Sequence, residues 1–320
     1  MRSILLVVMA SVMMAQTPTR APAGQLQTFL VSVMNPTGQY IPDIKPDDLM
    51  LEENGVRQEI ANLQPDTDAP ISLGILIDKS TSMRLPVATQ GGEKVSAALL
   101  AANGAAKVVL KLTKPQDEYL FMTFDDVFDV KQNFTSDSKK MTEVLSKNLA
   151  VGGSTRLYRA IGDALKETGK KAKNRRKALI VITDVHDTSG DKVEDLQATI
   201  RASEIPVYTF GMRWDAWGVP GEDHLPGQST YEESVLKMMA VDSGGYSMVV
   251  DIPNLLSDYT ITRMVDFVST IAIDLREQYT LTYYSSSSLP QAERAVRIRS
   301  TKPDYRVRFT RDEGKSQNKK

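Results

Sequence analysis

The sequence contains no cysteine and only two histidines in its 320 residues. The lack of cysteine excludes disulfide bonds, thiolate nucleophiles, cysteine zinc sites and a lipid anchor on an N-terminal cysteine. Two histidines leave little material for histidine-rich metal sites or for acid–base chemistry by imidazole. An excess of positive charge is also missing, because 39 Lys and Arg stand against 40 Asp and Glu. We therefore expect no nucleic-acid partner, since such proteins carry a basic footprint.

Long apolar runs are missing as well, since no stretch reaches the roughly 20 consecutive apolar residues that a transmembrane helix needs. Residues 4–15 are uncharged, rich in Leu, Val and Met, and preceded by Arg2. This pattern is typical of a secretory signal peptide. We expect cleavage after Ala15 and a mature chain that is secreted or periplasmic, with no transmembrane segment. An uncleaved membrane anchor is the alternative.

The middle of the chain alternates between two apolar patterns. Continuously apolar runs, typical of strands in a sheet covered on both faces, occupy residues 71–77, 119–124, 178–183, 205–210 and 246–250. Between them, apolar residues recur at helical spacing, most clearly in residues 95–109, 157–168 and 261–275. This alternation predicts an α/β fold with a doubly wound, mostly parallel sheet. The gap after Phe124 is too short for a crossover, so residues 127–134 should form one antiparallel edge strand.

Both ends of the chain have the pattern of β-structure. Asn54-Gly55 lies between alternating segments, which is a strong β-hairpin signal. Alternation of apolar and polar residues returns in residues 279–283. We therefore expect the two ends to pair into one small β-domain beside the α/β domain. The expected organisation is a signal peptide in residues 1–15, an N-terminal β segment in 16–68, the α/β domain in 69–277, and a C-terminal β segment with a tail in 278–320.

Short oxygen-bearing side chains follow several of the predicted strands. Asp78, Ser80 and Ser82 follow the first strand of the middle region. Thr155 follows paired glycines before a predicted helix, and Asp184 ends a later strand. Ligands of open α/β sheets bind outside the carboxyl ends of the strands, where these residues should meet. Two carboxylates and three hydroxyls suit a hard divalent ion such as Mg²⁺ or Mn²⁺ better than zinc, and they leave one position open.

These residues resemble a known family. Asp-x-Ser-x-Ser at 78, 80 and 82, a Thr after paired glycines, and an Asp after an Ile-Val-Ile strand resemble the metal-ion-dependent adhesion site of the von Willebrand factor type A domain. The resemblance covers residues 69–277 and implies a Rossmann-like fold. Outside it, residues 43–55 and 278–284 resemble the leader and the trailer of acidobacterial-type, von Willebrand factor A-related exported proteins.

The resemblance implies a role for each matched residue. Ser80, Ser82 and Thr155 would offer hydroxyl oxygens to the Mg²⁺ or Mn²⁺ ion. Asp78 and Asp184 would act directly or through bound water. An Asp or Glu carboxylate of a partner protein would then take the open position. Neutral hydroxyl ligands leave the ion with residual positive charge, which favours such a partner.

The chain departs from the family pattern at one place. Val185-His186-Asp187 follows Asp184 where the family has Gly, which alters the loop beside the ion. His186 is thereby a candidate partner-binding residue, with an ordinary place on a surface loop as the alternative. A simpler interpretation treats Asp78 as a strand-end residue and the serines as helix caps. That interpretation does not account for Asp184.

Two further segments have alternative interpretations. Trp214 and Trp217 lie in residues 213–230, which is long for a connection between a strand and a helix. They either recognise the partner beside the open ion or pack this segment against the β-domain. The basic residues of 166–177 are expected on the face away from the ion, as a solvated surface and not as a nucleic-acid patch.

These features favour an exported, metal-dependent protein-binding module of the adhesion type without enzymatic activity. The chain lacks the Gly-x-Ser-x-Gly elbow and the Gly-x-x-x-x-Gly-Lys loop. One alternative is a Mg²⁺-dependent phosphoesterase with Asp78 as nucleophile and Lys79 or His186 assisting. Another is a structural envelope component with an unused site.

Overall fold

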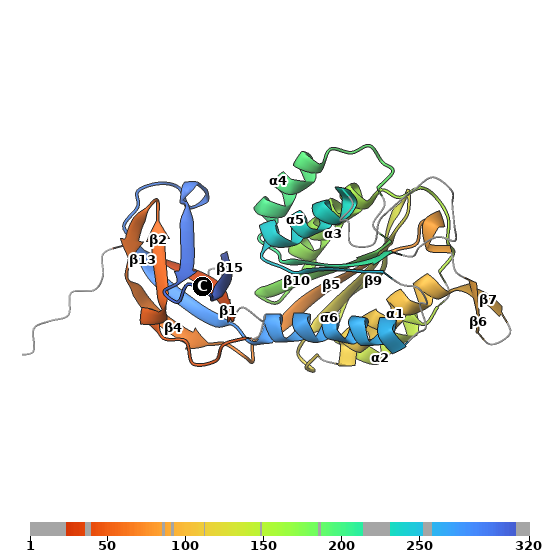
Figure 1. Cartoon of the computed structure of the whole chain (residues 1–320), viewed down its shortest axis with the longest axis horizontal. Coiled ribbons are helices and arrows are strands. Elements are labelled where there is room, and N and C mark those ends of the chain that lie inside the picture. The colour runs from red at the N-terminus through yellow and green to blue at the C-terminus, as the bar shows by residue number, and fades with distance from the viewer. Residues whose placement is uncertain are drawn as a thin grey trace, which may run out of the picture.

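The structure is a computed structural model of the chain, and it describes residues 24–35, 40–84, 87–90, 93–111, 113–147, 149–184, 187–213, 231–251 and 258–311. Figure 1 shows two parts joined end to end. One part consists of β-sheets built from the two chain ends. The other is larger and layered, with helices on both faces of a sheet. The predicted signal peptide lies outside the described residues.

A six-stranded sheet forms the middle layer of the larger part, in the order β12-β11-β10-β5-β8-β9. Its strands are β5 (Ile71–Asp78), β8 (Glu118–Phe124), β9 (Phe128–Thr135), β10 (Arg176–Thr183), β11 (Val207–Arg213) and β12 (Ser247–Asp251). Neighbours are parallel except for β9, which runs antiparallel to β8 at the edge. The short connection after Phe124 predicts this edge strand. The continuous apolar runs fall on the other strands, and every residue of β5 is buried.

Helices cover both faces of this sheet (Figure 1). In the described part of the chain, one face carries α1 (Ala97–Lys111), α2 (Ser138–Leu145) and α6 (Asp258–Arg276), and the other carries α3 (Leu157–Lys171), α4 (Val193–Ser203) and α5 (Tyr231–Ser243). Each set of helices forms its own apolar core with the sheet. The protein is thus a mixed α/β protein with a central, mostly parallel sheet. None of these described helices is long and apolar enough to cross a membrane.

A short hairpin precedes α1. The apolar spacing predicts that the helix has already begun within this hairpin. β6 (Val87–Gln90) pairs antiparallel with β7 (Glu93–Ser96), and α1 begins only at Ala97. The predicted helical stripe is therefore wrong at Val95, which lies in β7. Ser96 marks the true start of the helix. Its hydroxyl accepts a hydrogen bond from the Leu99 N–H at 3.1 Å, as an N-cap residue does.

The two chain ends contribute strands to a common antiparallel sheet of order β15-β1-β13-β4. These strands are β1 (Gln25–Met34), β4 (Ile60–Pro65), β13 (Tyr279–Ser285) and β15 (Arg306–Arg311). A second sheet contains β14 (Val296–Ser300), β2 (Leu49–Glu53) and β3 (Val56–Gln58) in that order. Phe29, Val31 and Leu281 belong to one apolar core that draws on both chain ends. Short 3-10 turns complete the described elements: η1 (Pro46–Asp48), η2 (Thr81–Arg84) and η3 (Gln291–Glu293).

The turn between β2 and β3 has the geometry that Asn-Gly predicts. Asn54 and Gly55 both have positive φ angles, of 51° and 79°. Left-handed backbone at both central residues matches the right-handed twist of the paired strands. The Asn54 side chain also accepts a hydrogen bond from the Ala295 N–H at 2.9 Å, which ties the turn to the chain before β14.

Arg176 ties the beginning of β10 to two other segments. It is 2% exposed and donates hydrogen bonds to the Leu275 carbonyl at 2.9 Å and the Asp66 carbonyl at 2.8 Å. The prediction of a solvated basic surface over residues 166–177 is thus wrong for Arg176. The reason is that Arg176 is the donor for a buried carbonyl group at the end of α6 and for a partly buried one after β4.

Asp274 near the end of α6 forms a second buried junction. Its carboxylate accepts hydrogen bonds from the Tyr208 hydroxyl at 2.5 Å and from the Arg308 guanidinium at 2.7 Å. Burial raises the pKa of Asp274, and the charge of Arg308 opposes that rise. Since Tyr208 lies on β11 and Arg308 on β15, this trio links the terminal sheet to the larger part.

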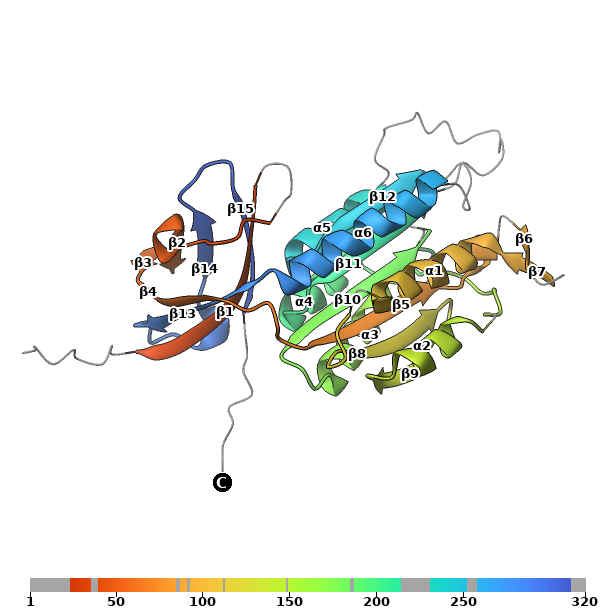
Figure 2. The same ribbon diagram turned by 90° about the horizontal axis from the view of Figure 1, so that it is seen from below.

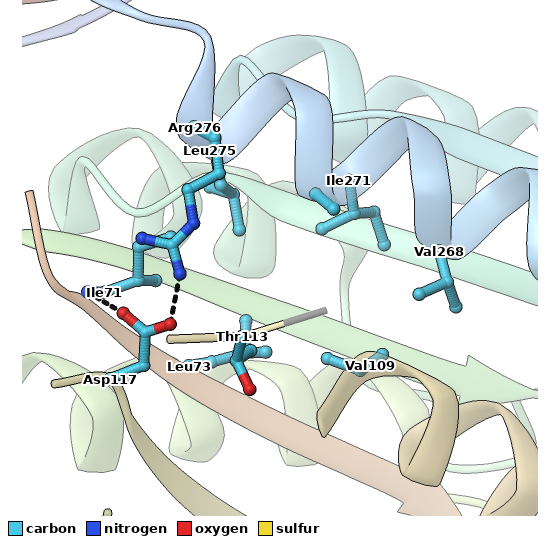
Figure 3. Close-up of a pocket in the computed structure, with 10 residues that line it drawn as sticks. Ile71, Leu73, Val109, Thr113, Asp117, Val268, Ile271, Leu275 and Arg276 are labelled. Carbon is cyan, nitrogen blue, oxygen red and sulfur yellow. Dashed lines mark hydrogen bonds and ion pairs between the residues drawn. The ribbon is translucent and has the colours of Figure 1, made fainter. Parts of the chain in front are cut away.

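Helix α6 packs along the central sheet over a small apolar cavity of about 20 Å³. Figure 3 shows Arg276, at the end of the helix, reaching Asp117. Asp117 also accepts a hydrogen bond from the Ile71 N–H at 2.9 Å. Asp117 therefore holds the end of α6 next to the beginning of β5. Figure 2 shows β5 running from there, beside the terminal sheets, toward the β6–β7 hairpin at the opposite end of the molecule.

Candidate metal centre

Three loops meet at the carboxyl end of β5. The first follows β5, the second leads into α3 and the third follows β8. The Lys79 N–H donates to the Phe124 carbonyl at 2.8 Å, and the Gly152 N–H donates to the Lys79 carbonyl at 3.1 Å. Thr81 donates to the Gly153 carbonyl from its N–H at 3.1 Å and from its hydroxyl at 2.8 Å. These bonds hold the first loop between the other two.

Asp78 is the last residue of β5 and is fully buried. Its Oδ1 accepts a hydrogen bond from the Ser80 N–H at 2.8 Å, and its Oδ2 accepts one from the Thr183 hydroxyl at 2.7 Å. Asp184, directly after β10, is 6% exposed. Burial, and after it the charge of Asp184, raises the pKa of Asp78 to about 7. The structure thus brings two buried carboxylates close enough to repel each other.

The two serines of the Asp-x-Ser-x-Ser motif lie side by side. Ser80 is buried and Ser82 is exposed, and their Oγ atoms are 3.0 Å apart. The tight turn of η2 causes this approach, because the Met83 N–H donates to the Ser80 carbonyl at 3.0 Å. Oxygen-bearing side chains therefore extend from the buried end of β5 out to the surface at Ser82.

The loop after Asp184 is fastened to Thr155, which is itself 4% exposed. The Thr155 N–H donates to the Thr188 hydroxyl at 2.9 Å, and the Thr188 N–H donates to the Thr155 carbonyl at 2.8 Å. The neighbouring Asp187 accepts a hydrogen bond from the Tyr158 N–H at 3.2 Å in the first turn of α3. The residue pattern does not predict that Asp187 and Thr188 hold this loop. No motif in the sequence marks them, because Asp and Thr are common in turns and loops.

Gly153 lies close to the turn after β8, where the second and third loops meet. Its φ is 79°, and a Cβ placed on it would lie 2.2 Å from the Asp126 Oδ1. The neighbouring Asp125 forms an ion pair with Lys79. A side chain at position 153 would therefore displace the Asp126 carboxylate and would also strain the left-handed backbone. Only glycine combines this φ with this contact at low energy.

The predicted ligands differ in how directly they contact one another in the structure. Direct hydrogen bonds connect Asp78 with Ser80 and Ser80 with Ser82, whereas Asp184 acts on Asp78 through its charge. Thr155 is held near these residues because Gly152 and Gly153, in the same loop, form hydrogen bonds with the loop after β5. The predicted partner-binding residues, His186, Trp214 and Trp217, lie outside the described residues.

This donor set fits a hard divalent cation. Within the described ranges, no group of three or more His, Cys, Asp and Glu side chains could hold a metal ion. An ion at this place would need hydroxyl oxygens beside the two carboxylates, as the predicted set provides. Such oxygen ligands suit Mg²⁺ or Mn²⁺. Burial and, after it, the charge of Asp184 raise the pKa of Asp78, and a cation would offset both by stabilising the ionised carboxylates.

Comparison with protein families identifies the core of the larger part. Residues 73–186 match the model of the von Willebrand factor type A domain. The chain therefore contains a von Willebrand factor type A domain, as the residue pattern predicts. The match includes all five predicted metal ligands, from Asp78 to Asp184, and its ends lie inside the predicted domain of residues 69–277. No curated protein matches the chain.

Several solved structures are similar to part of this chain. BatB from Bacteroides thetaiotaomicron is 21% identical, with 63% of this chain and 98% of that chain covered and a TM-score of 0.43. A von Willebrand factor type A protein from Catenulispora acidiphila is 16% identical, with coverage of 80% and 52% and a TM-score of 0.48. Proximal thread matrix protein 1 of the mussel byssus, with a zinc-occupied MIDAS motif, is 14% identical, with coverage of 70% and 50% and a TM-score of 0.47. This chain thus spans about half the length of the last two structures.

Proposed function

From the von Willebrand factor type A domain in residues 73–186, we propose that this protein is an exported, metal-dependent protein-binding module of the adhesion type. It would hold a divalent cation at the carboxyl end of β5 and bind a carboxylate of a partner protein through that cation. The observation that carries the proposal is the pair of buried carboxylates, Asp78 and Asp184, beside the adjoining hydroxyls of Ser80 and Ser82.

The proposed ion is Mg²⁺ or Mn²⁺. Ser80, Ser82 and Thr155 offer it hydroxyl oxygens, while Asp78 and Asp184 supply the negative charge. Where Asp78 and Asp184 act through bound water, the hydroxyl ligands are neutral and leave residual positive charge on the ion. An Asp or Glu side chain is then attracted to an open position. The exposure of Ser82 supports access from solvent to this position.

Several parts of the proposal concern the rest of the chain. Residues 1–15 are proposed to be a signal peptide and the mature protein to be secreted or periplasmic. Residues 16–68 and 278–320 are proposed to form a small β-domain, which the pairing of β1 with β13 and β15 supports. Trp214, Trp217 and His186 are proposed to contact the partner.

A peptide array tests the proposal directly. The protein, loaded with Mn²⁺, is applied to an array of Glu- and Asp-containing peptides and to the same peptides carrying Gln and Asn. We expect binding to a subset of the acidic peptides that disappears with EDTA, with the amide peptides and in Asp78→Ala. Binding that is indifferent to EDTA and to the amide change would contradict the proposal.

Two alternatives, an enzyme and a structural component, are tested by companion assays. Metal-dependent hydrolysis of p-nitrophenyl phosphate, abolished in Asp78→Ala, would favour a phosphoesterase. The ion pair between Lys79 and Asp125 argues against Lys79 as its assisting group. An Asp78→Ala variant that is silent in both metal binding and peptide binding would instead favour a structural component with an unused site.

A further inference from the structure

A polar cavity of about 70 Å³ lies where the terminal sheet meets the larger part. Residues from four regions line it: the beginning of β10, the segment between α4 and β11, the end of α6, and β1 with β15. It lies at the amino ends of the parallel strands β10 and β11, whereas the candidate metal centre lies at the carboxyl ends of β5 and β10. Neither of the proposed metal-binding carboxylates contributes to it.

Positive charge predominates around this junction cavity. Arg175, Arg176, Lys177 and Arg311 line it, together with a single acid, Glu204. Arg311 lies 3.7 Å from that carboxylate. Outside the lining, Asp66 pairs with both neighbouring arginines, at 3.1 and 3.2 Å. Two carboxylates thus face four cationic side chains, so the cavity keeps an excess of positive charge.

Gln278 is buried in the lining without a partner for its amide oxygen. The residue is 7% exposed, and its Oε1 forms no hydrogen bond with any described residue. Such a buried polar atom is uncommon, because leaving it unpaired costs free energy. A half-turn of the amide exchanges its oxygen for the NH₂ group, so Gln278 can serve as donor or acceptor.

Lys177 is the second group in the lining with spare hydrogen-bonding capacity. Its side chain is half-buried and forms no ion pair with the described acids. Its ammonium group has three donors and is a strong partner for an anion. Lys177 and Gln278 therefore present a charge and an amide to the same enclosed space.

We propose that the junction cavity binds a small tetrahedral oxyanion of the phosphate or sulfate type. A cavity needs about 10–15 Å³ for each water-sized group, so 70 Å³ holds about five. A phosphate ion has five non-hydrogen atoms, which are bonded and therefore need less space than five separate waters. Lys177 and Arg311 supply charge and Gln278 supplies an amide donor. The bound anion links β10, β15 and the end of α6, and so strengthens the junction between the two parts.

Calorimetric titration of the full chain with inorganic phosphate tests this proposal. The titration is carried out in EDTA and in the Asp78→Ala background, so that no anion is held by a metal ion. Potassium chloride at equal ionic strength is the reference, and sulfate and glycerol 3-phosphate are further titrants. We expect saturable binding of phosphate and sulfate but not of chloride. Equal binding of glycerol 3-phosphate would assign the site to phosphate esters as well as to the free anion.

Matched variants locate the binding. Lys177→Gln and Gln278→Glu are expected to weaken phosphate binding at least tenfold, because one removes a cation and the other adds an opposing charge. Lys170→Gln changes the net charge equally on an exposed residue outside the lining and should leave the affinity unchanged. No phosphate binding, or equal losses in Lys177→Gln and Lys170→Gln, would overturn the proposal. Neither result bears on the metal centre, since EDTA and Asp78→Ala remove that site throughout.

Discussion

At the scale of single residues, Gly153 controls how closely two loops of the candidate metal centre approach. We predict that Gly153→Ala destabilises the protein by about 1–3 kcal/mol, since a left-handed backbone and a contact with Asp126 both oppose a side chain. Gly152→Ala is the matched control, because a Cβ there meets nothing within 4 Å. Urea denaturation of both variants checks this. Equal losses of stability in Gly153→Ala and Gly152→Ala would contradict a special requirement for glycine at position 153.

Thr188 is the residue that fixes the position of Thr155. Thr188→Val removes the hydroxyl that accepts from the Thr155 N–H and keeps the shape of the side chain. One such hydrogen bond stabilises by about 0.5–1.5 kcal/mol, so the fold should survive. We predict instead a weaker affinity for Mn²⁺, by about tenfold at most, measured by calorimetry. Thr188→Ser retains the hydroxyl and should behave like the wild type.

The pattern of residues predicts which side chains gather at the site but not what holds them. Asp-x-Ser-x-Ser at the end of a buried strand is recognisable because strand ends of parallel sheets converge. The contact between Thr155 and Thr188 joins residues far apart in the chain. Threonine at an exposed loop has many ordinary uses, so nothing in the sequence distinguishes this one.

At the scale of elements, Arg176 decides how β10, α6 and the segment after β4 are joined. Arg176→Met leaves the carbonyls of Leu275 and Asp66 without their buried donor. We predict a loss of on the order of 3 kcal/mol in the free energy of unfolding. Arg175→Met is the control, because its side chain is 42% exposed and its ion pair with Asp66 is worth less than about 1 kcal/mol. Chemical denaturation in urea measures both, and a larger loss for Arg175→Met would contradict this account.

Elements with buried faces are predicted well from sequence, and a surface hairpin is not. The five parallel strands appear as continuous apolar runs because helices cover both of their faces. The hairpin of β6 and β7 lacks such a pattern, and the helical spacing extends into it at Val95. Arg176 was misassigned for a related reason. Composition marks a cation as a surface residue, and only tertiary contacts show that it satisfies buried carbonyls.

At the scale of the whole molecule, Arg308 and Asp274 couple the terminal sheet to the larger part. Arg308→Met leaves the buried Asp274 carboxylate with the Tyr208 hydroxyl but without its counter-charge. Breaking a buried pair in this way costs about 3–5 kcal/mol, which we predict for this variant by urea denaturation. Arg306→Met, at an exposed position at the beginning of the same strand, should cost less than about 0.5 kcal/mol. A loss in Arg308→Met as small as that of the control would show that the two parts are not coupled through this pair.

The interleaving of the chain ends follows from their matching β patterns on either side of the helical region. β1 lies between β13 and β15, so the sheet needs both ends of the chain. The alternation of residues predicts strands at both ends, and their common class predicts that they pair. Their order within the sheet depends on which apolar faces meet in the shared core, and a single strand pattern does not contain that information.

Thermal unfolding with and without divalent ions tests the central claim, a cation at the carboxyl end of β5. A ligand at ten times its dissociation constant stabilises the native state by about 1.4 kcal/mol, which is a shift of a few degrees. We predict that Mg²⁺ or Mn²⁺ raises the midpoint relative to EDTA, and that Asp78→Ala abolishes the rise. Asp129→Asn, which changes a partly exposed carboxylate on β9, should retain it. A midpoint that no ion raises, or a rise that persists in Asp78→Ala, would contradict the claim.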